Sequence, residues 1–388
     1  MKIDLDSLTQ AVRQENVDGW LFYGFQHRDP LSDEFLMLNP AQVTTRRWFY
    51  LLPADKTDAV KICHAIEAGA LDALPGALRL YSSQEELKSE LSRFKGLRLA
   101  AQYSPDLPVF SYLDHGAALM LADCGIELVP SGNLIQQVKG VLNAEGIASH
   151  RRAADHLYAI VDLARKLMSG RIASGAELYE GDVQALIMDE FAKRGLETDH
   201  PPIVAAGAHS ADPHYAPQGR GSLIEADRII QLDLWARETR GTGIYADISW
   251  VFFSGRTVPS DAAEVFAAVR GARDELIAYL NRELPERRVA GHEADRLCRE
   301  YIRKRGYGEY LIHRTGHGID TLPHGYGVNL DSIEFPDPRP FMEGSCFSVE
   351  PGIYLKDFGM RTEINAYIAY NQAVISGGDI QDEIIPLA

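Results

Sequence analysis

Glu350-Pro-Gly and Arg361-Thr-Glu363, near the C-terminal end, each place a carboxylate beside residues typical of a buried strand. Glu350 ends the apolar run that begins at Phe347, and Glu363 directly precedes the run that begins at Ile364. A carboxylate in an apolar strand costs on the order of several kcal/mol unless it is paired, and a metal ion is a common partner. We therefore expect further metal-binding side chains elsewhere in the chain.

Length and charge limit the possible classes of protein. The 388 residues are too many for one ordinary hydrophobic core, so two domains are expected. The formal net charge of −16 argues against binding to nucleic acids or anionic membranes, which favour basic surfaces. No apolar run reaches the roughly 20 residues needed to span a bilayer.

The cysteines and the N-terminal residues predict a cytoplasmic protein. The sequence from Met1 to Ser7 lacks the apolar segment of a signal peptide. The four cysteines are scattered without a Cys-x-x-Cys motif, which is typical of reduced, buried thiols (Cys63, Cys124, Cys298 and Cys346). Neither a disulfide framework nor a zinc–thiolate site is expected.

Two α/β domains are predicted, residues 1–143 and residues 144–388. Helical and strand patterns alternate in the first, with apolar strands such as 20–24, 46–53 and 97–103, and it has no cluster of metal-binding side chains. The second begins with long amphipathic helices, and Gly195 is the expected C-terminal stop of the helix that starts near Glu177.

Four strand acids recur in two similar halves of the second predicted domain. Asp233 and Asp247 interrupt apolar strands 14 residues apart, and Glu350 and Glu363 lie 13 residues apart. In each half, helices and a histidine-bearing segment precede the acids. Two related αβ halves would bring the four carboxylates together at a pseudo-twofold centre.

A shell of four carboxylates and the imidazole of His317 could hold two divalent ions. An oxygen-rich shell with one imidazole suits Mn(II), Co(II) or Fe(II), and Zn(II) is compatible. Two such ions can lower the pKa of a shared water and polarise a carbonyl group, which is the chemistry of amide hydrolysis.

The sequence resembles the "pita-bread" metallopeptidases, which include methionine aminopeptidase, aminopeptidase P and prolidase. The resemblance runs through residues 145–388 and is carried, in chain order, by Asp233, Asp247, Gly316-His317-Gly-Ile, Val349-Glu350-Pro-Gly-Ile-Tyr and Arg361-Thr-Glu363. It implies a C-terminal domain of two pseudo-twofold αβ halves. It also implies a smaller N-terminal α/β domain of the creatinase/prolidase type.

The resemblance also implies roles for the matching residues. One ion would be bound by His317, Glu350, Glu363 and Asp247, and the other by Asp233, Asp247 and Glu363. Glu350 would also act as the base toward the bridging water. His324 matches the histidine that stabilises the tetrahedral intermediate, and His214 matches an upstream histidine that contacts the substrate.

Two arginines and three departures from the family pattern concern the surroundings of the metals. Arg361 would orient the carboxylates, and Arg339 is a candidate for holding a substrate carboxylate. Gly325 follows His324 where the family usually has Glu or Asp, and Asp320 stands where Gly is common. The segment between the two aspartates is also a few residues longer than usual. Other nearby histidines are interpreted as structural (His200, His209 and His313).

The resemblance predicts a cytoplasmic, homodimeric exopeptidase with two divalent ions, Mn(II) preferred. It would hydrolyse the Xaa-Pro bond of dipeptides or short peptides through a metal-bridging hydroxide, as a prolidase or as an aminopeptidase P. One alternative is a non-peptidase hydrolase or lyase of small amides or C–N bonds on the same scaffold. Another is a catalytically inactive binding module. The intact ligand set argues against a metal-free enzyme like creatinase and against the inactive module, and it leaves metal-using relatives with other substrates open.

Overall fold

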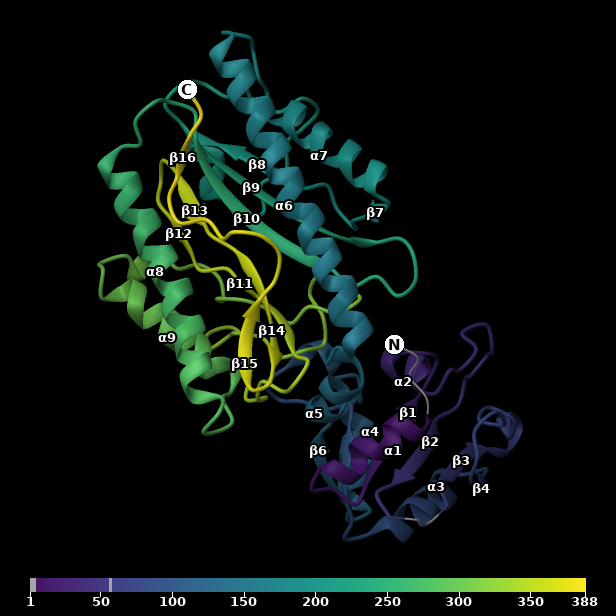
Figure 1. Ribbon diagram of the computed structural model, residues 1–388. Coiled ribbons are helices and arrows are strands. Elements are labelled where there is room, and N and C mark those ends of the chain that lie inside the picture. The colour runs from purple at the N-terminus through teal and green to yellow at the C-terminus, as the bar shows by residue number, and fades with distance from the viewer. Residues whose placement is uncertain (1–4, 56–57) are drawn as a thin grey trace. The chain divides into compact units, whose positions relative to one another are not determined.

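The computed structural model describes residues 5–55 and 58–388, which form two compact units (Figure 1). One unit ends at Lys139, and the other comprises Gly140–Ala388. Asn143, after which the sequence predicts the domain boundary, is the N-cap of the long helix α6 in the second unit. Among the described residues, no helix is both long and apolar enough to cross a lipid bilayer.

The first unit is built on a mixed sheet with the strand order β4-β3-β2-β1-β5-β6. Strands β1 and β2 are antiparallel, whereas β5 is parallel to β1 and β6 is parallel to β5. Its elements are α1 Leu5–Gln14, β1 Gly19–Gly24, α2 Pro30–Phe35, β2 Trp48–Pro53, β3 Val60–His64, η1 Ala65–Glu67, β4 Ala77–Tyr81, α3 Gln84–Leu91, η2 Ser92–Phe94, β5 Arg98–Ala101, η3 Pro108–Phe110, α4 His115–Asp123, β6 Glu127–Pro130, α5 Gly132–Ile135 and the π-helical turn η4 Gln136–Gly140.

The expected alternation of helix and strand is present in this unit, together with elements that the sequence did not predict. Strands β3 and β4 and helix α2 were not predicted. Most of β4 is exposed at the sheet edge, so it lacks the apolar pattern of a buried strand. Helix α2 begins with Pro30 and is capped by Asp29, whose carboxylate accepts hydrogen bonds from two backbone N–H groups.

The second unit contains two αβ halves around a central group of strands. Its first sheet has the order β16-β10-β9-β7, with β8 paired to β9, and its second has the order β11-β14-β15. Strands β12 and β13 form a separate antiparallel pair. Its elements are α6 Ala144–Ala173, α7 Glu180–Arg194, β7 Leu196–Glu197, β8 Ile203–Ala206, η5 Gly207–Ala211, β9 Ile229–Glu238, β10 Ala246–Phe253, α8 Ser260–Glu283, α9 Gly291–Arg303, η6 Gly308–Tyr310, β11 Cys346–Val349, β12 Gly352–Tyr354, β13 Gly359–Arg361, β14 Ile364–Ala369, β15 Gln372–Ile375 and β16 Ile385–Pro386.

Local signals in the sequence explain the ends of the first two helices of this unit. The Asn143 side chain accepts a hydrogen bond from the Gly146 N–H at 2.9 Å, which satisfies one free donor of the first turn of α6. Helix α7 ends at Gly195, whose φ of 67° is left-handed and favours glycine. The predicted stop at Gly195 is therefore confirmed.

Strand β9 divides the first half of the unit into an apolar face and a polar face. Ile230, Leu232 and Leu234 pack with the buried side of α6 and α7. Successive strand residues point to opposite faces, so Asp233 faces away from these helices. Helices α6 and α7 lie along one side of this sheet in Figure 1. Burial of the apolar face of β9 against α6 and α7 thus fixes the strand, and the Asp233 carboxylate on the opposite face can make other contacts.

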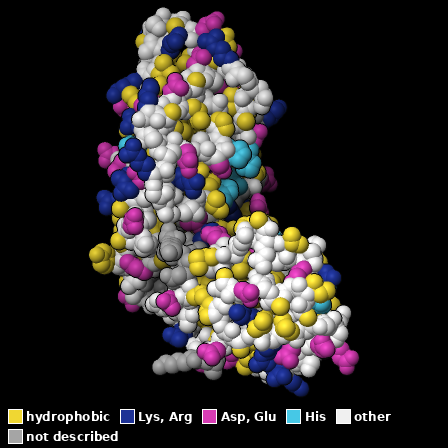
Figure 2. Space-filling view, turned by 90° about the vertical axis from the view of Figure 1, so that its right-hand side faces the viewer, with side chains coloured by type: hydrophobic (Ala, Val, Ile, Leu, Met, Phe, Trp, Pro, Cys, Tyr) yellow, Lys and Arg dark blue, Asp and Glu magenta, His cyan; other side chains and the backbone are white. Residues whose placement is uncertain are grey.

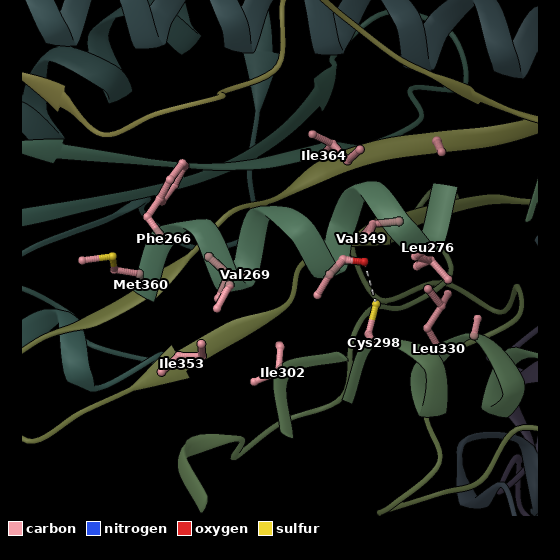
Figure 3. Close-up of a cluster of buried hydrophobic side chains, with 14 of the residues drawn as sticks. Phe266, Val269, Leu276, Cys298, Ile302, Leu330, Val349, Ile353, Met360 and Ile364 are labelled. Atoms are coloured by element: carbon pink, nitrogen blue, oxygen red, sulfur yellow. Dashed lines mark hydrogen bonds between the residues drawn. The ribbon is translucent and has the colours of Figure 1, made fainter. Parts of the chain in front are cut away.

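The second hydrophobic core lies between helices α8 and α9 and the C-terminal strands. Val269 and Leu276 of α8, Cys298 of α9 and Met360 of β13 are all buried there (Figure 3). The Cys298 thiol donates a hydrogen bond to the Ala272 carbonyl oxygen at 3.3 Å. All four cysteines are buried and free, as expected.

Candidate active site

The first pair of acids lies on one face of the β9–β10 hairpin. In the antiparallel register, Asp233 is opposite Ser249, and Asp247 is opposite Trp235. Because side chains alternate between faces with a period of two, these four residues share the face opposite α6. Both aspartates are buried, with 6% of each residue exposed.

The second pair of acids lies at the ends of strands β11 and β14. Val349 pairs with Ile364 in the antiparallel register, so Glu350 follows β11 where Glu363 precedes β14. Glu363 also forms an isolated antiparallel bridge with Ser249 of β10. This bridge joins the two halves of the unit directly at the acids.

His317 reaches the acids from a loop that pairs with β11. Its backbone N–H donates to Ser348 Oγ at 3.0 Å, and its carbonyl oxygen accepts from the Ser348 N–H at 2.9 Å. Nε2 of the ring lies 3.4 Å from Glu350 Oε1 and 3.7 Å from Asp247 Oδ2. Nδ1 lies 3.3 Å from the Gly318 carbonyl oxygen, which favours the tautomer with the proton on Nδ1. The lone pair of Nε2 then faces the carboxylates, as a metal ligand requires.

Arg361 supplies a buried positive charge among these acids. Its guanidinium forms an ion pair with Asp233, and Nε lies 3.7 Å from Glu350 Oε2 and 4.0 Å from Glu363 Oε2. Nε–H also donates to Ser249 Oγ at 3.1 Å. The position of Arg361 two residues before Glu363 therefore fits the predicted role of orienting the carboxylates.

A chain of hydrogen bonds behind Arg361 orients its guanidinium. Nδ1 of His313 lies 2.6 Å from the Arg314 carbonyl oxygen, so it carries the proton, and Nε2 accepts from the Tyr354 hydroxyl at 2.8 Å. The Tyr354 oxygen in turn accepts from Nη1–H of Arg361 at 3.1 Å. Burial lowers the pKa of His313 to about 4, so the ring is neutral at pH 7 and can act as the acceptor.

Ser249 and Asn365 connect the acids of the two halves. Ser249 Oγ lies 3.0 Å from Asp233 Oδ1 and 2.9 Å from Glu363 Oε2, and its single proton can be donated to one of them at a time. The Asn365 side chain accepts from the Asp247 N–H at 2.7 Å and donates to the Asp247 carbonyl oxygen at 2.6 Å. These side chains fix the acids of one half against the other.

The charges of the site fit divalent cations. Burial, followed by repulsion from neighbouring carboxylates, raises the pKa of Asp247 and of Glu363 well above ordinary values. Asp247 Oδ1 and Glu363 Oε1 are buried without a hydrogen-bond partner. Such atoms cost free energy unless a cation binds them. One ligand atom from each of Asp247, His317 and Glu363 lies within 4.8 Å of the others, close enough to share an ion.

The acids form the floor of a pocket of about 430 Å³ in the second unit. Besides His317, three more histidines line this pocket: His200, His214 and His324. Figure 2 shows histidine side chains gathered on the surface of this unit. The His324 ring packs against the His317 ring with a centroid distance of 4.2 Å. His324 is partly exposed to solvent at the pocket. Removal of water from around its ring by the neighbouring pocket residues nevertheless lowers its pKa. His324 is therefore a neutral hydrogen-bond donor beside the acids at pH 7.

Arg339 lies away from this pocket. It is buried and pairs with Asp337 at 2.6 Å, and its guanidinium donates to the carbonyl oxygens of Tyr326 and Gly327, both at 2.7 Å. These contacts tie the loop after His324 to the core. The structure thus gives Arg339 a structural position and does not support its expected contact with a substrate carboxylate.

Some residues of the site have no counterpart in the prediction from sequence. Ser249 could have been found, since it stands two residues after Asp247 on the same strand face. Tyr354 and Asn365 reach the site through the tertiary fold, and no spacing in the sequence marks them. His209 is structural as predicted, with Nδ1 2.8 Å from the buried carboxylate of Glu180. His200, interpreted as structural, instead lines the pocket.

Comparisons with known proteins agree with this architecture. The chain matches metallopeptidase family M24 over residues 148–369. It is 33% identical over 204 residues to the Xaa-Pro dipeptidase of Lactobacillus helveticus, an alignment that covers 52% of this chain and 49% of the relative. The chain spans about half the length of the curated relatives that it matches first.

Solved structures match over nearly the whole chain. Dipeptidase PepE from Mycobacterium ulcerans has a TM-score of 0.67 at 20% identity, with 99% of this chain and 96% of that chain covered. X-Pro aminopeptidase from Thermotoga maritima has a TM-score of 0.58 at 22% identity, with 99% of each chain covered. The expected pita-bread fold with a preceding α/β domain is confirmed. Because the family match covers more than half of the chain, the protein belongs to metallopeptidase family M24.

Proposed function

We propose that this protein is a dinuclear metallopeptidase that hydrolyses the Xaa-Pro bond of dipeptides or short peptides. The observation that carries the proposal is the convergence of three buried acids, the partly buried Glu350 and His317 on one pocket. Two carboxylate oxygens there are buried without a hydrogen-bond partner. The name of the Lactobacillus helveticus relative, Xaa-Pro dipeptidase, supports the choice of substrate.

The ligands of the two ions are assigned from the resemblance and are compatible with the geometry. Asp247 and Glu363 would bind both ions, and Asp233 would complete one of the two sites. His317 and Glu350 would complete the other. Bound divalent ions would supply an acidified water and a polarised carbonyl group. Mn(II) is the proposed metal, since the shell is rich in oxygen, and Co(II), Fe(II) and Zn(II) are compatible with the same ligands.

The other steps of the proposed reaction would be carried out by different residues of the pocket. Glu350 would accept the proton of the attacking water, and burial, which raises the pKa of its carboxyl group, favours that transfer. His324, neutral at pH 7, would donate a hydrogen bond to the oxyanion that develops on the substrate. His214, exposed on the pocket wall, would contact the peptide. Arg361 would hold the carboxylates in their relative positions.

The proposed substrate has proline after the scissile bond. Its tertiary amide lacks an N–H group and its ring is rigid, so a pocket shaped for that ring can select the bond. The apolar side chains of Ile203, Trp235 and Leu322 line the pocket beside the acids. We further propose a homodimer in the cytoplasm, the latter on the basis of four buried free thiols.

A substrate panel tests the proposal. The metal-free protein would be reloaded with Mn(II), Co(II) or Zn(II) and offered Xaa-Pro dipeptides, Xaa-Pro-Yaa tripeptides and creatine. Cleavage of dipeptides alone would identify a dipeptidase, and cleavage of tripeptides would identify an aminopeptidase P activity. Turnover of creatine without any Xaa-Pro cleavage would support the non-peptidase alternative. Unchanged dipeptide hydrolysis by Glu350→Ala would contradict the proposed mechanism.

A further inference from the structure

One buried carboxylate spans the loop that carries His324 into the pocket. Asp320 is 1% exposed. Its Oδ1 accepts a hydrogen bond from the Leu322 N–H at 2.9 Å, and its Oδ2 accepts from the Tyr326 N–H at 2.7 Å. These two amides stand two residues before and two residues after His324. The single side chain therefore fixes the backbone on both sides of the histidine.

Gly325 leaves the space that this carboxylate occupies. A Cβ atom at position 325 would lie 2.6 Å from Asp320 Cγ, 2.6 Å from its Oδ2 and 2.8 Å from its backbone nitrogen. Carbon atoms do not approach that closely without a shift of the chain. The φ of Gly325 is outside the left-handed region, so its backbone conformation does not itself require glycine. Glycine is needed at this position for space.

The contact joins two departures from the family pattern. An acid usually follows the histidine at position 324, and glycine is common at position 320, whereas this chain has Gly325 and Asp320. We infer that Asp320 is the positioning residue of His324 and supplies, from position 320, the carboxylate that the pattern places at position 325. The two departures then form one exchange, because Gly325 leaves the space that the Asp320 carboxylate occupies.

The remaining anchors of the loop hold other points of its backbone. The Gly325 N–H donates to the Gly318 carbonyl oxygen at 2.7 Å, and Arg339 holds the Tyr326 carbonyl oxygen. The position of the His324 ring against His317 thus depends on how the short segment between Leu322 and Tyr326 is held. A displacement of about 1 Å in a catalytic group can cost about 100-fold in rate, so the two hydrogen bonds of Asp320 have a large effect on turnover.

A double-mutant cycle with His324 tests the inference, whose catalytic consequence rests on the proposed function. Asp320→Asn keeps the shape of the side chain but replaces one acceptor with a donor. We expect it to lower kcat about 10-fold to 100-fold and to change KM less than about 3-fold. In the His324→Ala background, the same change should lower kcat less than about 2-fold. Equal losses in both backgrounds would overturn the inference.

Asp331→Asn is the matched control for burial and backbone capping. Asp331 is also fully buried and accepts backbone N–H bonds from Ile333, Glu334 and Phe335, away from the residues that line the pocket. We expect it to lower Tm as much as Asp320→Asn does while it changes kcat less than about 2-fold. A loss of kcat as large as that of Asp320→Asn would assign the effect to general destabilisation.

Restoring the family pattern provides a second test. Gly325→Glu alone should lower kcat/KM more than about 100-fold, because two carboxylates would compete for one buried space. Asp320→Gly combined with Gly325→Glu should recover at least about 10-fold of that loss. If Gly325→Glu does not fold, recovery is measured as the return of a cooperative thermal transition. A double variant no better than Gly325→Glu would contradict the exchange.

Hydrogen exchange separates this inference from the proposed function. In Asp320→Asn, which keeps one of the two acceptor oxygens, at least one of the Leu322 and Tyr326 amides should exchange about 10-fold faster or more than in the unmodified protein, whether or not any peptide is cleaved. If the unmodified protein cleaves no Xaa-Pro bond but exchange rises as expected, the proposed function fails and the positioning role stands. Unchanged exchange at both amides would overturn the inference even if Xaa-Pro cleavage is found.

Discussion

The two αβ halves of the second unit position their acids in different ways. Asp233 and Asp247 lie within the long antiparallel strands β9 and β10, whose register alone puts them on one face. Glu350 and Glu363 lie just outside the short strands β11 and β14, and their N–H groups donate to the carbonyl oxygens of Thr315 and Ser249 at 2.8 and 3.4 Å. The first pair is therefore positioned by regular secondary structure. The second pair depends more on side chains such as Arg361 and Ser249.

The largest effect is expected when one half loses the acid that is proposed to bind both ions. Asp247→Asn and Glu363→Gln should each lower kcat/KM more than about 1000-fold and reduce bound metal, since each acid is proposed to bind both ions. Metal content by mass spectrometry and steady-state kinetics measure both effects. Asp261→Asn, an exposed acid in the first turn of α8, is the control. Full metal content in either variant would contradict the proposal that both acids bind both ions.

The pH dependence of metal binding tests the charge of the shared acids. Burial and mutual repulsion raise the pKa values of Asp247 and Glu363 in the metal-free protein, so these groups keep protons at a higher pH than ordinary acids. Raised acid pKa values make the metal-free fold lose stability as pH rises above the ordinary range, and bound cations remove that loss. Apparent metal affinity should therefore fall as pH is lowered from 8 through the raised pKa values, by about 10-fold per pH unit for each proton displaced.

Calorimetric titration with Mn(II) and thermal melts with and without the ion measure this effect. The increase in Tm caused by the ion should grow as pH rises. His317 has the opposite shift, since burial lowers the pKa of its ring, and it is neutral throughout this range. A metal affinity that begins to fall only in the ordinary carboxyl range, at about pH 4, would contradict the raised carboxyl pKa values.

Arg361→Lys tests how far the second pair of acids depends on side-chain support. Lysine keeps the positive charge but cannot contact Asp233, Ser249 and Tyr354 together, because it lacks the planar fork of the guanidinium. We expect kcat/KM to fall about 10-fold to 100-fold, which is the usual cost of losing a group that orients metal ligands. Arg282→Lys, with 58% of its side chain exposed, should have no measurable effect. Equal activity in both variants would show that charge alone is sufficient.

The smallest expected effect comes from the hydroxyl group between the halves. Ser249→Ala removes a donor shared by Asp233 and Glu363 and an acceptor for Arg361 Nε–H, so stability should fall by about 1 kcal/mol. We expect kcat/KM to fall about 10-fold or less. Chemical denaturation and kinetics measure the two quantities, with the exposed Ser174→Ala as the control. An effect as large as that of Glu363→Gln would mean that Ser249, more than strand register, positions the acids.

The sequence predicted the acids and histidines of the site better than the residues that hold them in place. Apolar runs interrupted by a single acid identified the strands that carry Asp233 and Asp247, and an apolar run directly after an acid identified β14 beside Glu363, because burial of a charge on or beside a strand is rare unless it is used. The structure brings these acids together with Glu350, His317, His324 and Arg361 in one unit. Nothing in composition or spacing distinguishes Tyr354 or Asn365 from ordinary buried polar residues. Their contacts exist only once distant segments have folded together.

The residues expected near the substrate also show that contacts made by folding cannot be read from the sequence. Arg339 was expected near the substrate because it is a basic residue close in sequence to the acids, but closeness in sequence does not reveal that Asp337 holds it in the interior. Asp320 and Gly325 were noted as separate departures. Their direct contact depends on a loop conformation that no periodicity describes.

The parallel pairing of β16 with β10 has a consequence for how the protein folds during synthesis. Phe252 pairs with Ile385, and Ser249 bridges to Glu363. Because these partners are more than 100 residues apart, the ribosome releases the β9–β10 hairpin long before its partners exist. Its two aspartates must remain in water until the C-terminal strands emerge. The proposed metal ligands can therefore come together only when nearly all of this chain has left the ribosome.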